Sequence, residues 1–123
     1  MAKGLFRKEV RMNIFVTDPS PYISAVALDD KRVIKMILES AQMLSTVRNE
    51  FGYDGPYKTT HRNHPCTKWA RAAADNYYWL AEHFFTLCVE YTHRFGKTHK
   101  SNIAVTESGW RLPITIFPQT AMT

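Results

Sequence analysis

Apolar residues recur at helical spacing along two long stretches of this chain. In residues 30–47 they are Val33, Met36, Ile37, Ala41, Leu44 and Val47, and in residues 63–95 they include Trp69, Ala73, Tyr77, Leu80, Phe84, Leu87 and Phe95. A repeat of three or four residues is typical of an amphipathic helix that buries one face. The pattern therefore predicts a mostly all-α fold, a compact single-domain helical bundle built around two long helices.

Capping residues indicate where these two helices begin and end. Asp29 can cap the first helix, and Asn63 can cap the second, with Pro65 in its first turn, where a missing N–H costs nothing. Gly96 supplies a C-terminal stop. The second helix is therefore predicted to run from about Asn63 to Phe95.

The remaining segments predict shorter elements. Asn13 to Val16 is a β-prone run and predicts a short extended N-terminal segment, whereas Pro21 to Leu28 predicts a brief helix or turn. Residues 49–56 form a turn-rich connection. Residues 101–123 carry only short apolar runs interrupted by glycine and proline, so we expect an irregular tail there.

The net charge of +5 is spread unevenly over the 123 residues. Residues 1–12 carry +3 and predict a basic N-terminal extension, or a segment upstream of an internal start at Met12. Residues 13–123 are predicted to form one helical domain, because a chain of this length buries a single core. With only +2 left to it, this domain gives weak evidence by charge alone for a nucleic-acid partner.

Cysteine usage and hydropathy bear on location. Cys66 and Cys88 each occupy a helical position that suits a small apolar side chain, and two cysteines do not make a disulfide framework, so we expect both to be reduced. No stretch approaches the roughly 18 apolar residues that span a bilayer. These features predict a cytoplasmic protein without a membrane partner. The sequence implies no cofactor and leaves the oligomeric state open.

Candidate chemistry is concentrated between Tyr57 and Leu80, around the start of the second long helix. No acid occurs between Asp54 and Asp75. The basic residues in that interval are Lys58, His61, Arg62, His64, Lys68 and Arg71. Because a helix N-terminus attracts anions, added cations predict a seat for phosphate, with a solvated basic loop as the alternative.

The first long helix carries a polar stripe opposite its apolar face. Its members are Arg32, Lys35, Glu39, Gln42 and Thr46. Lys35 and Glu39 lie one turn apart, as an ordinary surface pair would. We predict that this stripe forms one wall of a polar cleft and that residues 58–71 form the other.

Two further chemistries stay open at this stage. His61, His64 and Cys66 could ligate zinc, although their spacing matches no closed-site pattern. The aromatic run Asn76 to Trp79 could stack on nucleic-acid bases, although helical spacing sends Tyr77 to the core.

The lysines of the first long helix offer another possibility. A lysine in a dry, cation-rich site can lose its proton and attack a sugar aldehyde as a Schiff-base nucleophile. Lys31 and Lys35 are the candidates, and Glu39 would be the nearest carboxylate. The alternative is that both lysines are fully solvated.

Longer motifs resemble known families. The segment MNIFVTDPSPYISAVALDDKRVIKMILESAQMLST, followed by YKTTHRNHPCTKWARAAADNYYWLAEHF and EYTHRFGKTHKS, resembles a group of small proteins encoded by tailed phages over residues 12–101. More distantly, the order of an extended N-terminus, a helix with a charged stripe, a YK…NHP turn and a long helix is similar to the pyrimidine-dimer DNA glycosylase superfamily. That resemblance implies a compact all-α domain that binds duplex DNA, extrudes a nucleotide and cleaves the glycosidic bond through an amine assisted by a glutamate.

The resemblance also implies roles for individual residues. It gives Glu39 the acid or base role, and it gives phosphate and base contacts to Arg32, Lys35, Lys58, His61, Arg62 and His64, with His64 close to the chemistry. The phage glycosylases use the amine of their mature N-terminus, whereas eleven residues precede Met12 here. Unless translation starts at Met12, a lysine such as Lys31 must supply the amine.

Two classes of ligand follow from these observations. The leading hypothesis is a phage protein of DNA glycosylase/AP-lyase type, acting on a modified or damaged base in duplex DNA. The alternative is a small phage protein that binds or hydrolyses a nucleotide signal of the host, with Tyr57 or Trp69 against the base and Asn63 and Arg71 among the phosphate contacts. A third is an interaction module without a ligand.

Overall fold

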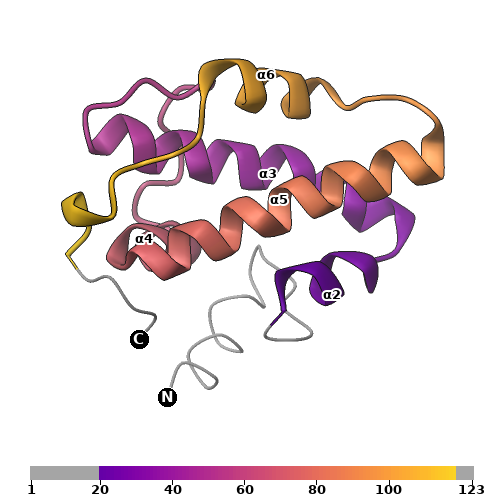
Figure 1. Ribbon diagram of the computed structural model, residues 1–123, viewed down its shortest axis with the longest axis horizontal. Helices are drawn as coiled ribbons and strands as arrows, with labels where there is room; N and C mark the ends of the chain where they lie inside the picture. Colours follow the sequence, from indigo (N-terminus) through magenta and orange to yellow (C-terminus); the bar gives the residue numbers. More distant parts are fainter. Residues whose placement is uncertain (1–19, 119–123) are drawn as a thin grey trace.

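Residues 20–118 are described by a computed structural model, and every regular element within them is a helix (Figure 1). The elements in chain order are α2 (Pro21–Val26), α3 (Asp30–Glu50), α4 (Pro65–Ala72), α5 (Ala74–Phe95), α6 (Lys100–Ser108) and the 3-10 turn η1 (Ile114–Ile116). The predicted all-α class is confirmed. The predicted basic extension and the extended segment at Asn13–Val16 lie outside the described residues.

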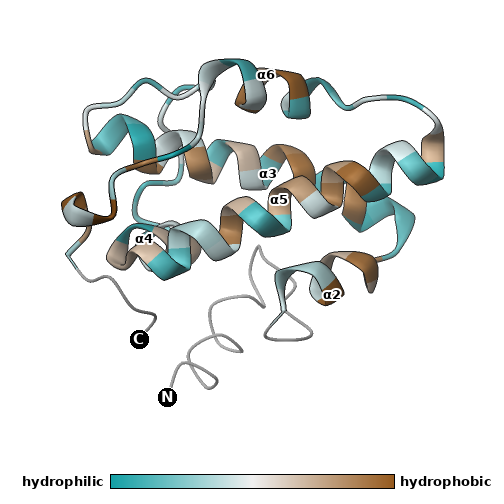
Figure 2. Cartoon of the chain, in the orientation of Figure 1, coloured by the Kyte–Doolittle hydropathy of each residue, from teal (hydrophilic) through white to brown (hydrophobic). Residues whose placement is uncertain are grey.

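The core lies between α3 and α5, which run side by side in opposite directions (Figure 1). α2 and α4 pack against α5, and α6 packs against α3. Figure 2 shows hydrophobic positions alternating with hydrophilic ones along both long helices, as their sequence period predicts. The largest fully buried side chains include Tyr77, Phe84, Met36, Ile37 and Leu44.

α3 begins and packs as the sequence predicts. The side chain of Asp29 accepts a hydrogen bond from the backbone N–H of Arg32 at 2.9 Å, which caps the helix. That hydrogen bond holds the pKa of the Asp29 carboxyl below its usual value, because it favours the charged form. The six apolar residues predicted to face the core are all buried.

The second long helix differs from the prediction, because it is broken at one residue. Ala73 has extended backbone angles (φ −148°, ψ 147°), so α4 ends before it and α5 begins after it. Across the break, the carbonyl group of Trp69 accepts a hydrogen bond from Nδ2 of Asn76 at 2.8 Å. Neither glycine nor proline marks the break, so the helical period runs through it unaltered. Gly96 ends α5 in the left-handed conformation, as predicted.

We expect Asn76→Ala to lower the free energy of unfolding by about 1 to 2 kcal/mol, because it removes a buried hydrogen bond between α5 and the end of α4. Asn102→Ala is the matched control, since the Asn102 side chain accepts only an exposed hydrogen bond from Thr106 within α6. Urea denaturation of the two variants measures the difference. Equal stabilities would show that Asn76 does not hold the break.

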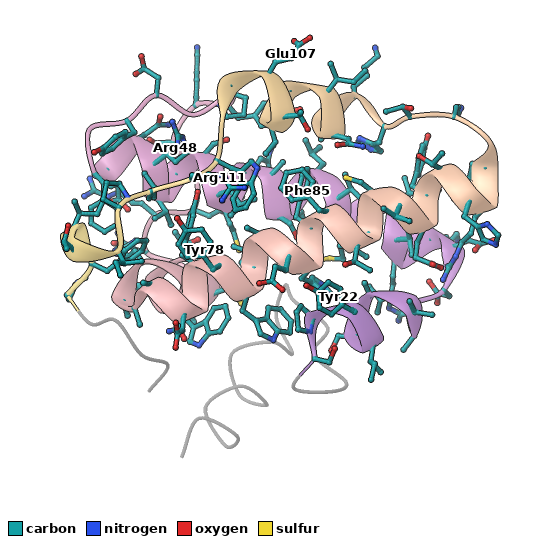
Figure 3. All side chains as sticks on the ribbon, in the orientation of Figure 1. Tyr22, Arg48, Tyr78, Phe85, Glu107 and Arg111 are labelled. Carbon is teal, nitrogen blue, oxygen red and sulfur yellow. The ribbon has the colours of Figure 1, made fainter. Side chains whose placement is uncertain are left out.

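The C-terminal segment is more ordered than the irregular tail predicted for it. α6 occupies Lys100–Ser108. Its sequence gave little helical signal, because it contains β-branched residues and buries only Ser101 and Val105. After α6, backbone groups of residues 111 and 112 form hydrogen bonds with side chains of α3 and α5. Oη of Tyr78 both donates to the carbonyl oxygen and accepts from the N–H of Leu112, and Arg48 donates to the carbonyl oxygen of Arg111 at 2.8 Å (Figure 3).

Both cysteines are buried and form no disulfide bond with each other, as expected for reduced thiols. Burial raises the pKa of the Cys88 thiol to about 12, so it stays protonated at neutral pH. Within residues 20–118, no helix is both long enough and apolar enough to cross a bilayer. A cytoplasmic location stays a prediction.

Candidate functional site

Four of the five residues of the predicted polar stripe are exposed or half-buried on α3, whereas Thr46 is fully buried, and the cleft between the stripe and residues 58–71 stays a prediction. Nζ of Lys35 lies 3.8 Å from Oε2 of Glu39, one turn away. The Glu39 side chain is 25% exposed, and that of Lys35 is 70% exposed. Lys31 and Arg32 are exposed in the first turns of the same helix. Glu39 is therefore a half-buried carboxylate that solvent can reach and that one lysine contacts, which suits a general acid or base.

The same side of α3 contacts the loop of residues 57–64 that precedes α4, which we call the corner. Thr46 lies about 10 Å beyond Glu39 along the helix axis, and its hydroxyl group bonds to both the N–H and the carbonyl oxygen of Thr60 at 3.0 Å. Asn49 and Glu50 follow at the helical period and also bond to residues of this corner. Glu39 and the corner thus occupy one side of a single helix.

The corner consists of residues 57–64 and ends in a histidine cap. Nδ1 of His64 accepts a hydrogen bond from the N–H of Cys66 at 3.1 Å, so His64 caps α4. The predicted cap, Asn63, is wrong by one residue, because Pro65 takes the first helical position and the cap directly precedes it. His61 has a positive φ of 52°, and its ring centroid lies 6.5 Å from that of His64.

Most of the predicted contact residues of the corner face solvent. Lys58, His61, Arg62 and Asn63 are exposed, while His64 is half-buried. An exposed lysine and an exposed histidine on a short loop beside a helix N-terminus can both reach a phosphate. These residues share one short loop, and their role as a seat for phosphate stays a prediction.

Glu50 neutralises two of the predicted phosphate contacts. Its carboxylate oxygens lie 3.1 Å from Nη2 of Arg62 and 3.0 Å from Nη1 of Arg71, and Arg71 also donates to the carbonyl oxygen of Arg62. The Glu50 side chain is only 16% exposed, which strengthens both attractions. The exposed charge of the corner therefore rests mainly on Lys58. Sequence reasoning missed Glu50, although the stripe of Glu39 and Thr46 reaches it if extended by one more turn.

The aromatic candidates for base contacts are occupied within the protein. Trp69 is 5% exposed and Trp79 is 6% exposed, and their rings meet edge to face at 5.9 Å. Tyr77 is fully buried, as predicted. Oη of Tyr57 lies 2.9 Å from Oγ of Ser101, so that ring joins the corner to α6. Trp69 and Trp79 belong to the core, and the base-stacking interpretation of the run Asn76 to Trp79 gains no exposed platform from them.

Comparison with known proteins assigns the chain to a family. The family model for pyrimidine dimer DNA glycosylase matches residues 12–103, which is most of the chain. The chain belongs to the pyrimidine dimer DNA glycosylase family. The matched region includes the α3 stripe, the corner and both α4 and α5. No curated protein and no solved structure matches the chain.

The predicted amine nucleophile has two lysine candidates on α3. Lys35 contacts Glu39 directly. Lys31 lies eight residues before Glu39, or about 12 Å along the axis. Met12, whose amine would serve in a chain that started there, lies outside the described residues.

The zinc interpretation of the corner has no support in the described part of the chain. No three His, Cys, Asp or Glu side chains within residues 20–118 lie close enough together to hold a metal ion. Cys66 is fully buried, and Nδ1 of His64 already accepts a hydrogen bond from the Cys66 backbone. Both groups are explained by the start of α4.

Proposed function

We propose that this protein is a DNA glycosylase that excises a damaged pyrimidine from duplex DNA, with Glu39 as its acid or base. Membership of the pyrimidine dimer DNA glycosylase family suggests DNA as the partner. The observation that carries the proposal is the placement of Glu39 and the exposed corner on one side of α3. One face thus offers a carboxylate for chemistry and cations for the phosphates that flank the damaged nucleotide.

In the proposed reaction, a neutral amine attacks C1′ of the deoxyribose. The bond from C1′ to the base breaks, and the base leaves with the electron pair. Glu39 accepts the proton that the attacking amine loses and passes it to O4′ as the sugar ring opens, while the departing base anion takes a proton from water. The product is an iminium ion that links the chain to the DNA. Lys58 and His61 hold the flanking phosphates, together with whichever of Lys31 and Lys35 does not supply the amine, whereas Arg32, Arg62 and Arg71 share their charge with neighbouring carboxylates.

The proposal is tested with a duplex that contains one site-specific cyclobutane pyrimidine dimer. The protein should break the glycosidic bond of one pyrimidine of the dimer and cut the strand there, while an undamaged duplex of the same sequence stays intact. Gel analysis of the labelled strand measures the cut, and mass analysis of the cut strands shows the detached base still joined to its neighbour through the dimer. No cutting of the damaged duplex, together with no duplex binding at low salt, would rule the proposal out.

The amine itself can be identified chemically. If a lysine of the α3 stripe is the nucleophile, borohydride added during turnover should link the protein to the damaged strand, and the modified peptide should contain Lys31 or Lys35. Alanine substitution of the modified lysine should abolish the adduct, and substitution of the other should leave it. An adduct that maps to neither lysine would place the nucleophile elsewhere in the chain.

The alternative ligand, a host nucleotide signal, has no specific observation in its favour. It required Tyr57 or Trp69 to hold the base, and Trp69 is buried in the core while the hydroxyl group of Tyr57 bonds to Ser101. The family also favours DNA. A phage origin stays a prediction.

A further inference from the structure

Three polar side chains of α3 fasten the loop that leads into the corner. Oδ1 of Asn49 accepts from the N–H of Gly55 at 2.8 Å, and its Nδ2 donates to the carbonyl oxygen of Tyr57 at 3.0 Å. Oγ of Ser45 accepts from the N–H of Tyr57 at 3.3 Å. With the two bonds between Thr46 and Thr60, five hydrogen bonds join one side of the helix to the backbone of three loop residues, Gly55, Tyr57 and Thr60.

The loop also packs directly on the helix backbone. A Cβ atom added to Gly55 would lie 2.6 Å from Cα of Ser45, which is closer than atoms can approach. Ser45 and Thr46 are fully buried beneath the loop. Buried hydroxyl groups must find partners, so they specify this one arrangement of the loop over others.

The fastened loop ends at a residue in an unfavourable backbone conformation. His61 has a φ of 52° and is the one residue other than glycine with positive φ in the described chain. Such a conformation persists only when its surroundings hold it, and it clusters at functional sites. The carbonyl oxygen of His61 accepts from the N–H of His64 at 3.0 Å on one side, and Thr46 fixes Thr60 on the other.

We propose that Thr46 and Asn49 are positioning residues that hold Lys58 and His61 in register with Glu39 for DNA binding. The inference rests on the proposed function. Thr46 and Asn49 touch no substrate, and they act through the loop. Since Glu39 lies on the same helix, the distance between the carboxylate and the phosphate contacts is set by α3 rather than by a free loop. An ordered loop loses less conformational entropy on binding than a mobile one. A substitution that releases the loop from α3 should therefore weaken substrate binding.

Thr46→Val tests this role, because it keeps the side-chain shape and removes both bonds to Thr60. We expect KM for the dimer-containing duplex to rise about fivefold to tenfold, equivalent to roughly 1 to 1.4 kcal/mol, while kcat stays within about twofold, because Glu39 is undisturbed. Thr46→Ser retains the hydroxyl group and should restore the KM. Thr86→Val is the matched control, since Thr86 bonds only to the carbonyl oxygen of Glu82 within α5.

His61→Gly is a second test, because it removes the imidazole and leaves the five hydrogen bonds between α3 and the loop in place. Glycine adopts positive φ without cost, so the variant should fold at least as stably as the natural chain, whereas loss of the imidazole should weaken duplex binding. In a double-mutant cycle, Thr46→Val and His61→Gly should raise KM by less than the product of their separate effects, because both act through the same residue.

The outcomes separate this proposal from the proposed function. If the natural chain cuts the damaged duplex and Thr46→Val matches Thr86→Val in KM, or lowers kcat alone, the positioning role is wrong while the proposed function stands. If the two effects in the cycle multiply independently, Thr46 does not act through His61, and the role is again wrong. If the natural chain neither binds nor cuts the damaged duplex, the proposed function fails and takes this proposal with it.

Discussion

Glu39→Gln should lower the rate of base excision by about 100-fold to 10,000-fold, the range that a lost general acid or base produces. Glutamine keeps the size of the side chain and can still accept a hydrogen bond, but it cannot take up the proton lost by the attacking amine. Because the Lys35 contact is exposed, the fold should change little in stability. Single-turnover cutting of the dimer-containing duplex measures the rate.

Two controls accompany this prediction. Glu107→Gln makes the same change on α6, where the carboxylate is exposed and points away from the body of the protein (Figure 3), and it should retain the natural rate. The affinity of Glu39→Gln for the damaged duplex should be equal to or higher than that of the natural chain, since a negative charge is removed from the binding face. A Glu39→Gln variant that cuts at the natural rate would exclude Glu39 from the reaction.

Acidification from pH 7.5 to pH 4 should remove about 3 kcal/mol of stability through His83 alone. His83 is fully buried, its Nδ1 lies 3.0 Å from the carbonyl oxygen of Pro21, and its ring stacks on Trp79. Burial lowers the pKa of His83 to about 4, from an ordinary value near 6.5 in the unfolded chain. The unfolded state therefore binds the proton first, and stability falls as pH drops below 6.5 until the loss is complete near pH 4.

Urea denaturation across this pH range tests the role of His83. His83→Gln keeps an amide donor for Pro21 and should be less stable at pH 7.5, but it should lose much less stability on acidification. Burial also lowers the pKa of His99, which caps α6 through Nδ1, so His99 adds to the loss in the same direction. His99→Asn retains a capping side chain and should keep most of the pH dependence. Equal pH dependence in His83→Gln and the natural chain would contradict the assignment.

The parts of the fold that were predictable from sequence are those fixed by local chemistry. The apolar period and the Asp29 cap define α3, and Gly96 ends α5, because each signal acts within one or two helical turns. The break at Ala73 was not predictable, since its stabilising bond joins Asn76 to Trp69 without disturbing the period. α6 was missed because a short helix with few buried residues produces little periodic signal.

The candidate site was likewise predictable only in part. The stripe was predictable because Lys35 and Glu39 are neighbours on one helix, and the resemblance assigned its glutamate. The charge balance of the corner was not predictable from sequence, because Glu50 reaches Arg62 and Arg71 only after the loop folds back on α3. Burial of Trp69 agrees with its place in the apolar repeat of residues 63–95, and packing against Trp79 leaves its ring without the exposed face that a base contact requires.

Duplex binding across a range of salt concentrations tests most directly whether the stripe and the corner form one DNA-binding face. The substrate is the dimer-containing duplex, and Glu39→Gln is the background, so that no strand is cut. Each of Lys35→Ala and Lys58→Ala should weaken binding and reduce the slope of log K against log salt by about 1, as expected for one lost phosphate contact. Lys100→Ala, on exposed α6, should leave affinity and slope unchanged. An unchanged slope in both Lys35→Ala and Lys58→Ala, or an equal loss in Lys100→Ala, would contradict the account.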